Sequence, residues 1–104
     1  MEVTLAPVSS IPEGEGRTFA VGSARLAVFR SRAGQVFATQ ADCPHKGGPL
    51  ADGLLGGTTL ICPLHAQKFD LATGAALSGD CHLKTYPARL NASGQILVEL
   101  DATP

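Results

Sequence analysis

Two cysteines and two histidines form a pair of short motifs in the middle of this 104-residue chain. Cys43 and His45 belong to the motif Cys-Pro-His, and Cys62 and His65 belong to the motif Cys-Pro-Leu-His. Thiolate and imidazole are the ligands that zinc and iron–sulfur centres take in proteins. The four side chains therefore predict a metal site carried on two loops.

The make-up of each motif bears on which metal centre is bound. Structural zinc sites commonly take cysteines from one motif and histidines from another, whereas here each motif supplies one of each. A [2Fe–2S] cluster with two cysteines on one iron and two histidines on the other fits this pattern. The surrounding glycines and prolines also fit it, because backbone N–H groups of such loops can donate to the sulfides. The alternatives are a zinc-stabilised interaction module without redox activity, or four side chains that never meet.

Three segments together resemble the Rieske [2Fe–2S] family: Cys-Pro-His-Lys-Gly-Gly-Pro-Leu at 43–50, Cys-Pro-Leu-His at 62–65 and Phe-Asp-Leu-Ala-Thr-Gly at 69–74. The resemblance implies that Cys43 and Cys62 hold the inner iron and that His45 and His65 hold the outer one. It also implies an all-β, Rieske-type fold, in which antiparallel base sheets carry an inserted cluster-binding subdomain.

The chain departs from the Rieske proteins of quinol-oxidising complexes at four positions. Gly48 and Leu64 replace the two further cysteines that cross-link the loops in those proteins. Gln67 and Phe69 replace a Ser and a Tyr whose hydroxyls point at the cluster there. Without these donors the reduced state is less stabilised, so we expect a reduction potential near the low end of the range of roughly −150 to +300 mV. The resemblance thus indicates a soluble, low-potential, ferredoxin-like electron carrier.

Length and composition predict one domain over residues 1–104, with the cluster-binding subdomain at about 42–80. A net charge of −1 and the lack of a basic cluster argue against nucleic-acid binding. No apolar stretch is long enough to predict a membrane span. Of the three cysteines, Cys81 is left without a partner, which favours a cytoplasmic location. Cys81 and His82 form a lone dipeptide, and we expect an inert thiol there.

Alternating and continuous apolar runs, separated by glycine-rich turns, predict an antiparallel β protein. Asp70 is expected to fix the turn to Thr73 and Gly74, and residues 50–57 are expected to form an excursion between the ligand loops that is too short for a helix. Hairpins are expected across Gly22-Ser23, across Ala33-Gly34 and across 91–94. The expected strands span residues 3–8, 17–21, 24–30, 35–40, 58–61, 67–70, 84–90 and 95–100.

No Ser/His/Asp constellation, carboxylate pair or nucleotide-binding glycine motif is present, so we expect an electron carrier without catalytic residues of its own. The segment 79–89, with Lys-Thr-Tyr-Pro at 84–87, resembles the small subunit of assimilatory NAD(P)H nitrite reductase, which reduces nitrite to ammonia. Its redox partner would be a flavin- and sirohaem-containing subunit. Phe-Ala-Thr at 37–39 and the motif at 62–65 also resemble ferredoxin components of aromatic-ring-hydroxylating dioxygenases, whose partners are an oxygenase and a reductase. The segment 84–87 favours the nitrite reductase family.

Overall fold

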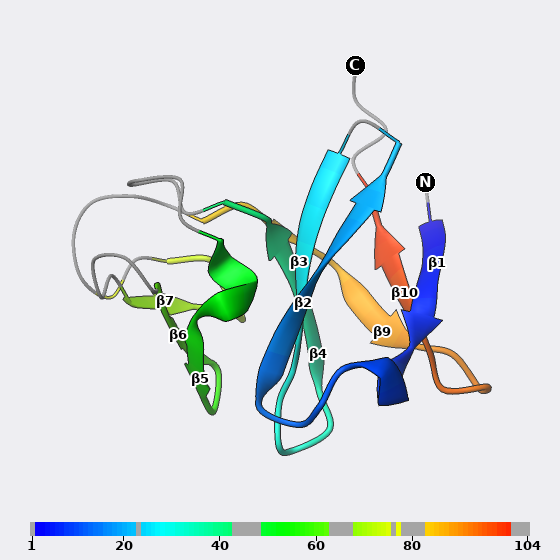
Figure 1. Cartoon of the computed structure of the whole chain (residues 1–104), viewed down its shortest axis with the longest axis horizontal. Helices are drawn as coiled ribbons and strands as arrows, with labels where there is room; N and C mark the ends of the chain where they lie inside the picture. Colours follow the sequence, from blue (N-terminus) through cyan, green and yellow to red (C-terminus); the bar gives the residue numbers. More distant parts are fainter. Residues whose placement is uncertain are drawn as a thin grey trace.

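Ten short strands and two 3-10 turns make up the described part of the chain, which comprises residues 2–22, 24–42, 49–62, 68–75, 77 and 83–100 of a computed structural model (Figure 1). The elements are β1 (Glu2–Pro7), η1 (Val8–Ser10), β2 (Glu15–Val21), β3 (Ala24–Arg30), β4 (Val36–Gln40), η2 (Leu50–Asp52), β5 (Leu54–Gly56), β6 (Thr59–Ile61), β7 (Lys68–Asp70), β8 (Thr85–Tyr86), β9 (Ala88–Leu90) and β10 (Gln95–Glu99). The expected all-β fold is confirmed.

The strands form three antiparallel sheets. The outer sheet has the order β1-β10-β9, the middle sheet β2-β3-β4-β8 and the small sheet β5-β6-β7. In Figure 1 the middle sheet lies between the other two. Because β1 pairs with β10, the outer sheet joins strands from the two ends of the chain, as the sequence predicts.

The strand β3 is buried on both of its faces. Ala27 and Phe29 belong to a core that also contains Leu60 of β6, and we call it the small-sheet core. Leu26 and Val28 belong to a second core, shared with β10 of the outer sheet. A strand covered on both faces has a continuous apolar run in place of alternation. The apolar run of β3 therefore specifies the middle layer of the fold.

The predicted hairpins of the middle sheet are confirmed. β2 and β3 pair from Glu15↔Arg30 to Val21↔Ala24, with Gly22 at a φ of +60° in the turn. β3 and β4 are joined by a turn in which Gly34 has a φ of +90°. Glycine adopts positive φ without the steric cost of a side chain, which explains its presence in both turns.

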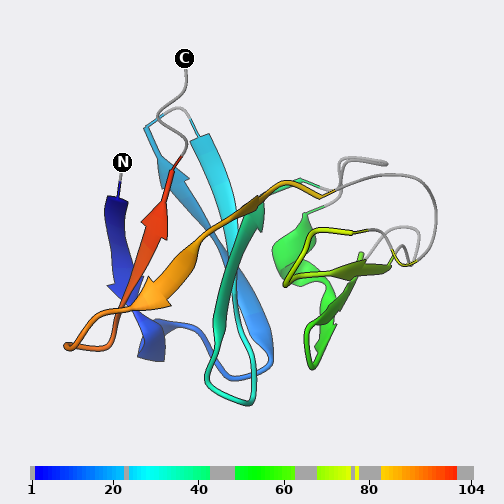
Figure 2. The same ribbon diagram turned by 180° about the vertical axis from the view of Figure 1, so that it is seen from behind.

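The expected single strand over residues 84–90 is wrong, because the chain changes sheets at Pro87. β8 pairs with β4 in the middle sheet, whereas β9 pairs with β10 in the outer sheet. Pro87 has no N–H to donate to a ladder and therefore interrupts the strand. Figure 2 shows this segment, in gold and orange, crossing the molecule from one side of the middle sheet to the outer sheet.

A strand is also present where the sequence predicted none, at Leu54–Gly56. This strand, β5, pairs with β6 through Leu54↔Ile61, Leu55↔Leu60 and Gly56↔Thr59. The 3-10 turn η2 precedes it and buries Leu50 completely. The small sheet thus has three strands.

Candidate metal centre

The four predicted ligands fall in two loops that the structure describes in part. Cys62 is described, whereas Cys43, His45 and His65 lie outside the described residues. The geometry of the site is therefore read from Cys62 and from the points where the two loops leave the sheets and return to them.

Cys62 follows β6 directly and is only 2% exposed. Its side chain is a free thiol and belongs to the small-sheet core, together with Leu50, Leu60 and Phe69. A strand end packed in an apolar core fixes the direction of a ligand and excludes water from it. The environment of Cys62 thus fits a thiolate ligand to the inner, solvent-shielded iron of a cluster.

The loop that contains Cys62 and His65 is closed by an antiparallel ladder. β6 and β7 pair through Ile61↔Lys68, Leu60↔Phe69 and Thr59↔Asp70. This register pairs Ile61 with Lys68, so the loop between these two residues begins and ends at neighbouring points of the small sheet.

The loop that contains Cys43 and His45 is closed in a similar way. Asp42 and Pro49 form an isolated antiparallel bridge, and the N–H of Leu50 donates to the carbonyl of Ala41 at 3.0 Å. Leu50 belongs to the same buried core as Cys62. Each of the two loops therefore has one end in the same apolar core.

A tight turn after β7 carries the chain away from the second loop. The N–H of Gly74 donates to the carbonyl of Asp70 at 2.6 Å, and the N–H of Ala72 donates to Oδ1 of Asp70 at 3.0 Å. The role expected of Asp70, to fix the turn to Thr73 and Gly74, is confirmed. Gly74 has a φ of +79°, and its carbonyl accepts the N–H of Leu83 at 2.9 Å. This turn thus ties the small sheet to the segment that leads into β8.

Phe69 is fully buried in the small-sheet core. Cys62 belongs to the same core. Gln67, the other position that differs from those proteins, lies outside the described residues, as do Gly48, Leu64, Cys81 and His82.

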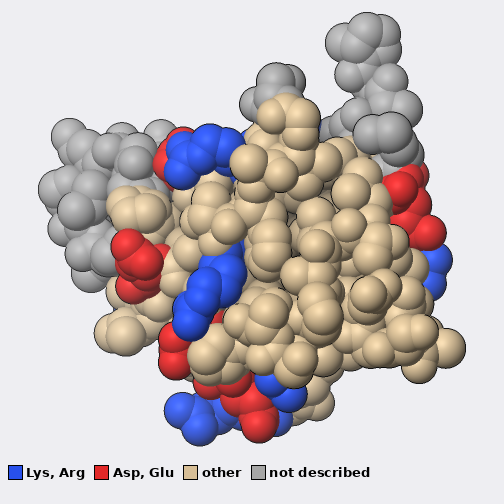
Figure 3. Space-filling view, turned by 45° about the vertical axis from the view of Figure 1, so that its right-hand side comes forward, with Lys and Arg blue, Asp and Glu red and all other residues tan. Residues whose placement is uncertain are grey.

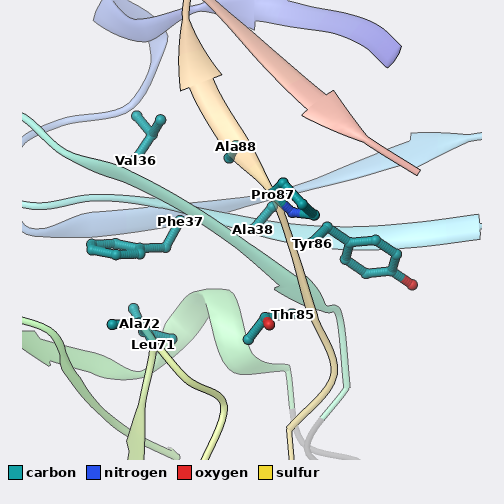
Figure 4. A pocket seen from close by; sticks show the side chains of 9 residues that line it. All are labelled: Val36, Phe37, Ala38, Leu71, Ala72, Thr85, Tyr86, Pro87 and Ala88. Carbon is teal, nitrogen blue, oxygen red and sulfur yellow. The ribbon is translucent and has the colours of Figure 1, made fainter. Parts of the chain in front are cut away.

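A cavity of about 450 Å³ lies where the chain crosses from β8 to β9, and it is separate from the two loops (Figure 4). Phe37 of β4, Leu71 of the turn after β7 and Tyr86 of β8 are among the side chains that line it. Among the residues that the structure describes, its lining contains no Cys, His, Asp, Glu, Lys or Arg. We therefore assign the cavity to the packing between the middle and small sheets and not to the metal site.

The charged side chains are dispersed over the surface. On the face in Figure 3, positive and negative groups lie next to each other near the border, and neither sign predominates. Arg25 pairs with Asp42 at 3.2 Å, Arg17 with Glu15 at 3.3 Å and Arg89 with Glu2 at 2.6 Å. All six side chains are substantially exposed, so each pair contributes little to stability. In the part of the chain that the structure describes, no helix has the length and apolar character needed to cross a bilayer.

The sequence model of the Rieske [2Fe-2S] domain matches residues 1–87 of this chain. The chain therefore belongs to the Rieske [2Fe-2S] domain family. It is an electron-transfer protein with a Rieske-type [2Fe–2S] cluster. The buried thiol of Cys62 and the common apolar base of the two loops fit such a cluster.

The similar proteins include ferredoxins of dioxygenase systems and, at the level of the fold, a nitrite reductase small subunit. The ferredoxin component of the naphthalene 1,2-dioxygenase system of Pseudomonas aeruginosa is 34% identical over 92 residues, which are 86% of this chain and 86% of that protein. A chain from the complex of reduced oxygenase and oxidised ferredoxin of carbazole 1,9a-dioxygenase superposes with a TM-score of 0.80 at 31% identity, covering 93% of this chain and 100% of that chain. A structure from Mycobacterium tuberculosis, described as an NADH-dependent nitrite reductase small subunit, superposes with a TM-score of 0.90 at 24% identity, over 99% of this chain and 97% of that chain.

Proposed function

We propose that Cys43, His45, Cys62 and His65 are the four ligands of the cluster, the cysteines on the inner iron and the histidines on the outer one. The position of Cys62 supports this assignment, because its thiol is buried at the end of β6 in the core that also closes the first loop. The cluster supplies storage for one electron at a time. The chain's own part is to keep the thiolate ligand dry and to anchor both loops on the sheets.

We propose further that the chain is the ferredoxin component of a ring-hydroxylating dioxygenase system and carries single electrons from a reductase to a terminal oxygenase. The observation that carries this proposal is the 34% identity over 92 residues to the naphthalene dioxygenase ferredoxin. The likeness to the carbazole dioxygenase complex, at 31% identity, supports it. The relatives thus shift the balance away from nitrite reductase, which the segment 84–87 favoured.

The second candidate function is that of the small subunit of an NAD(P)H-dependent nitrite reductase. It is supported by the TM-score of 0.90 over 99% of this chain. At 24% identity this likeness bears on the fold alone, so we rank it below the dioxygenase ferredoxin. Membership of the Rieske family leaves the zinc-stabilised interaction module without support.

In either system the chain acts through protein partners and performs no substrate chemistry itself. We propose that residues 1–104 form one domain. We also propose a cytoplasmic location, because two of its three cysteines are assigned to the cluster and Cys81 has no partner for a disulfide.

Electron transfer to candidate partners distinguishes the two functions. The protein is reduced anaerobically and mixed with the oxidised terminal oxygenase of a naphthalene or carbazole dioxygenase system, and reoxidation of the cluster is followed by visible absorption. We expect rapid reoxidation, and product formation once the reductase and the aromatic substrate are added. In parallel, nitrite-dependent NADH oxidation by a nitrite reductase large subunit is measured with and without this chain. Stimulation of that activity together with no transfer to either oxygenase would reverse the ranking.

A further inference from the structure

Gln40, the last residue of β4, makes two hydrogen bonds through its side-chain amide to backbone groups that are far apart in the sequence. Its Nε2 donates to the carbonyl oxygen of Asp42 at 2.8 Å. Its Oε1 accepts the N–H of Lys84 at 2.9 Å. The amide orientation follows from these partners, because a carbonyl can only accept and an N–H can only donate. Gln40 thus bridges the residue before Cys43 and the residue before β8.

The side-chain oxygen of Gln40 accepts the N–H of Lys84, while its backbone carbonyl accepts a hydrogen bond from Thr39. In an antiparallel ladder a hydrogen-bonded pair exchanges two backbone bonds. The N–H of Gln40 does donate to the carbonyl of Lys84 at 2.9 Å. The carbonyl of Gln40, however, accepts Oγ1 of Thr39, a fully buried residue, at 2.8 Å. The side-chain oxygen of Gln40 thus takes the place of the backbone carbonyl oxygen of Gln40 as the acceptor for Lys84. With Oε1 bound to Lys84, the Nε2 of the same amide donates to Asp42.

The bond to Asp42 acts on the peptide that leads into the first ligand. A planar peptide unit joins the carbonyl of Asp42 to the nitrogen of Cys43, so a hydrogen bond on that carbonyl restrains the unit as a whole. The side chain of Asp42 is less well restrained, because its ion pair with Arg25 joins groups that are 51% and 57% exposed. The Gln40 amide adds a second restraint at this point, a hydrogen bond to the backbone from a half-buried residue.

We propose that Gln40 is a positioning residue for the metal centre. Its amide anchors the peptide before Cys43 to Lys84, the residue before β8, and so fixes the point at which the chain leaves the middle sheet toward the first ligand. Groups that orient metal ligands from outside the coordination sphere tune both metal retention and redox behaviour. The proposal rests on Cys43 being a ligand and is independent of which redox partner the chain serves.

The test compares Gln40→Met, which keeps the side-chain length and removes both hydrogen bonds, with Gln35→Met as the matched control. Gln35 precedes β4 at its other end, is exposed, and makes no side-chain hydrogen bond to any residue that the structure describes. For each holoprotein we would record the EPR g-values, the midpoint potential, the rate of cluster loss to a chelator and the exchange of the Lys84 amide. A third variant, Gln40→Glu, keeps an acceptor for Lys84 but has no donor for Asp42.

We expect Gln40→Met to shift the g-values and the potential, to lose the cluster about tenfold faster and to lose protection of the Lys84 amide. Gln35→Met should match the wild type. Gln40→Glu should retain the protection of Lys84 while its g-values and potential still shift, which a purely structural role would not produce. A Gln40→Met protein with wild-type g-values, potential and cluster lifetime would overturn the proposal.

Failure of a variant to fold is also decisive. If Gln40→Met does not fold with its cluster, unshifted g-values and potential in Gln40→Glu would refute the role. If neither Gln40→Met nor Gln40→Glu folds while Gln35→Met is normal, Gln40 is needed for the fold alone, and the positioning role is refuted. Failure of the ligand assignment is recognised separately, because Cys43→Ser would then keep the Rieske EPR signal.

Discussion

Gly53, between η2 and β5, packs directly against the backbone of Ile61 on β6. A Cβ at position 53 would overlap the carbonyl oxygen of Ile61 and would lie 3.1 Å from the carbonyl oxygen of Leu50. Both neighbours are backbone atoms of the small sheet and its preceding turn, so neither can rotate away. The absence of a side chain at Gly53 therefore lets the turn that ends the first loop approach the strand that leads into the second.

Replacing Gly53 with alanine should destabilise the small sheet. Overpacking of a close contact costs about 1–3 kcal/mol, and we expect a lower midpoint of thermal unfolding and less cluster per protein. The measurement is thermal unfolding of the holoprotein with cluster absorbance followed in parallel. Gly56→Ala is the control, because Gly56 lies at the end of β5, the strand that follows Gly53, and has open space around it. Equal behaviour of the two variants would contradict the packing argument.

Gly74 has a positive φ and also a close backbone neighbour. Gly74→Ala should therefore reduce the free energy of unfolding more than a glycine-to-alanine change at a position that has only the positive φ. A left-handed conformation costs an alanine about 1–2 kcal/mol. At position 74 a Cβ would also overlap the carbonyl oxygen of Leu83. Gly94 has a φ of +78° with nothing near it, which makes Gly94→Ala the matched control. We expect the denaturant midpoint to fall for both variants and to fall further for Gly74→Ala. The same loss in both would show that the contact with Leu83 contributes nothing.

Removal of a predicted outer-iron ligand should abolish the Rieske signature. His65→Ala is expected to lose the visible absorption and the EPR signal, and to fold in lower yield because binding of the cluster and folding are linked. His82→Ala should leave both spectra unchanged, since His82 is assigned no role at the metal. A His65→Ala protein with an intact spectrum would show that the ligand set is wrong.

The midpoint potential of the wild type should lie near the low end of the roughly −150 to +300 mV range of Rieske centres. Phe69 lies in the same buried core as Cys62, and Phe69→Tyr would place a hydroxyl close to the metal site. A hydrogen bond from that hydroxyl to sulfur would stabilise the more negative, reduced state, so the potential should rise. Protein-film voltammetry measures both values, with Phe19→Tyr as the control because Phe19 packs against the other core. A clearly positive wild-type potential would refute the expectation.

The sequence predicted those features that depend on local pattern or on ligand chemistry. The apolar runs correctly indicated the antiparallel strands of the middle sheet, and Gly22 and Gly34 marked the turns between them. The motif around Cys62 placed a thiol at a strand end, where the structure has it. These signals are carried by residue type and spacing, which the sequence states directly.

The features that the sequence did not reveal depend on tertiary contacts. β5 is a three-residue strand whose Leu-Leu-Gly has no alternation, and it exists because β6 provides a partner. The sequence predicted one strand over residues 84–90 and did not reveal that the residues on the two sides of Pro87 belong to different sheets. The hydrogen bonds of the Gln40 side chain to Asp42 and Lys84 are likewise tertiary contacts that no spacing encodes.

The strand β3 contributes side chains to both cores, Leu26 and Val28 to one and Ala27 and Phe29 to the other. Neither half of the molecule can therefore assemble its interior without a strand that the other half also requires. Destabilisation of the small sheet and its metal site should consequently also destabilise the distant hairpin of β9 and β10. The protein should therefore unfold in a single cooperative transition and not in two stages.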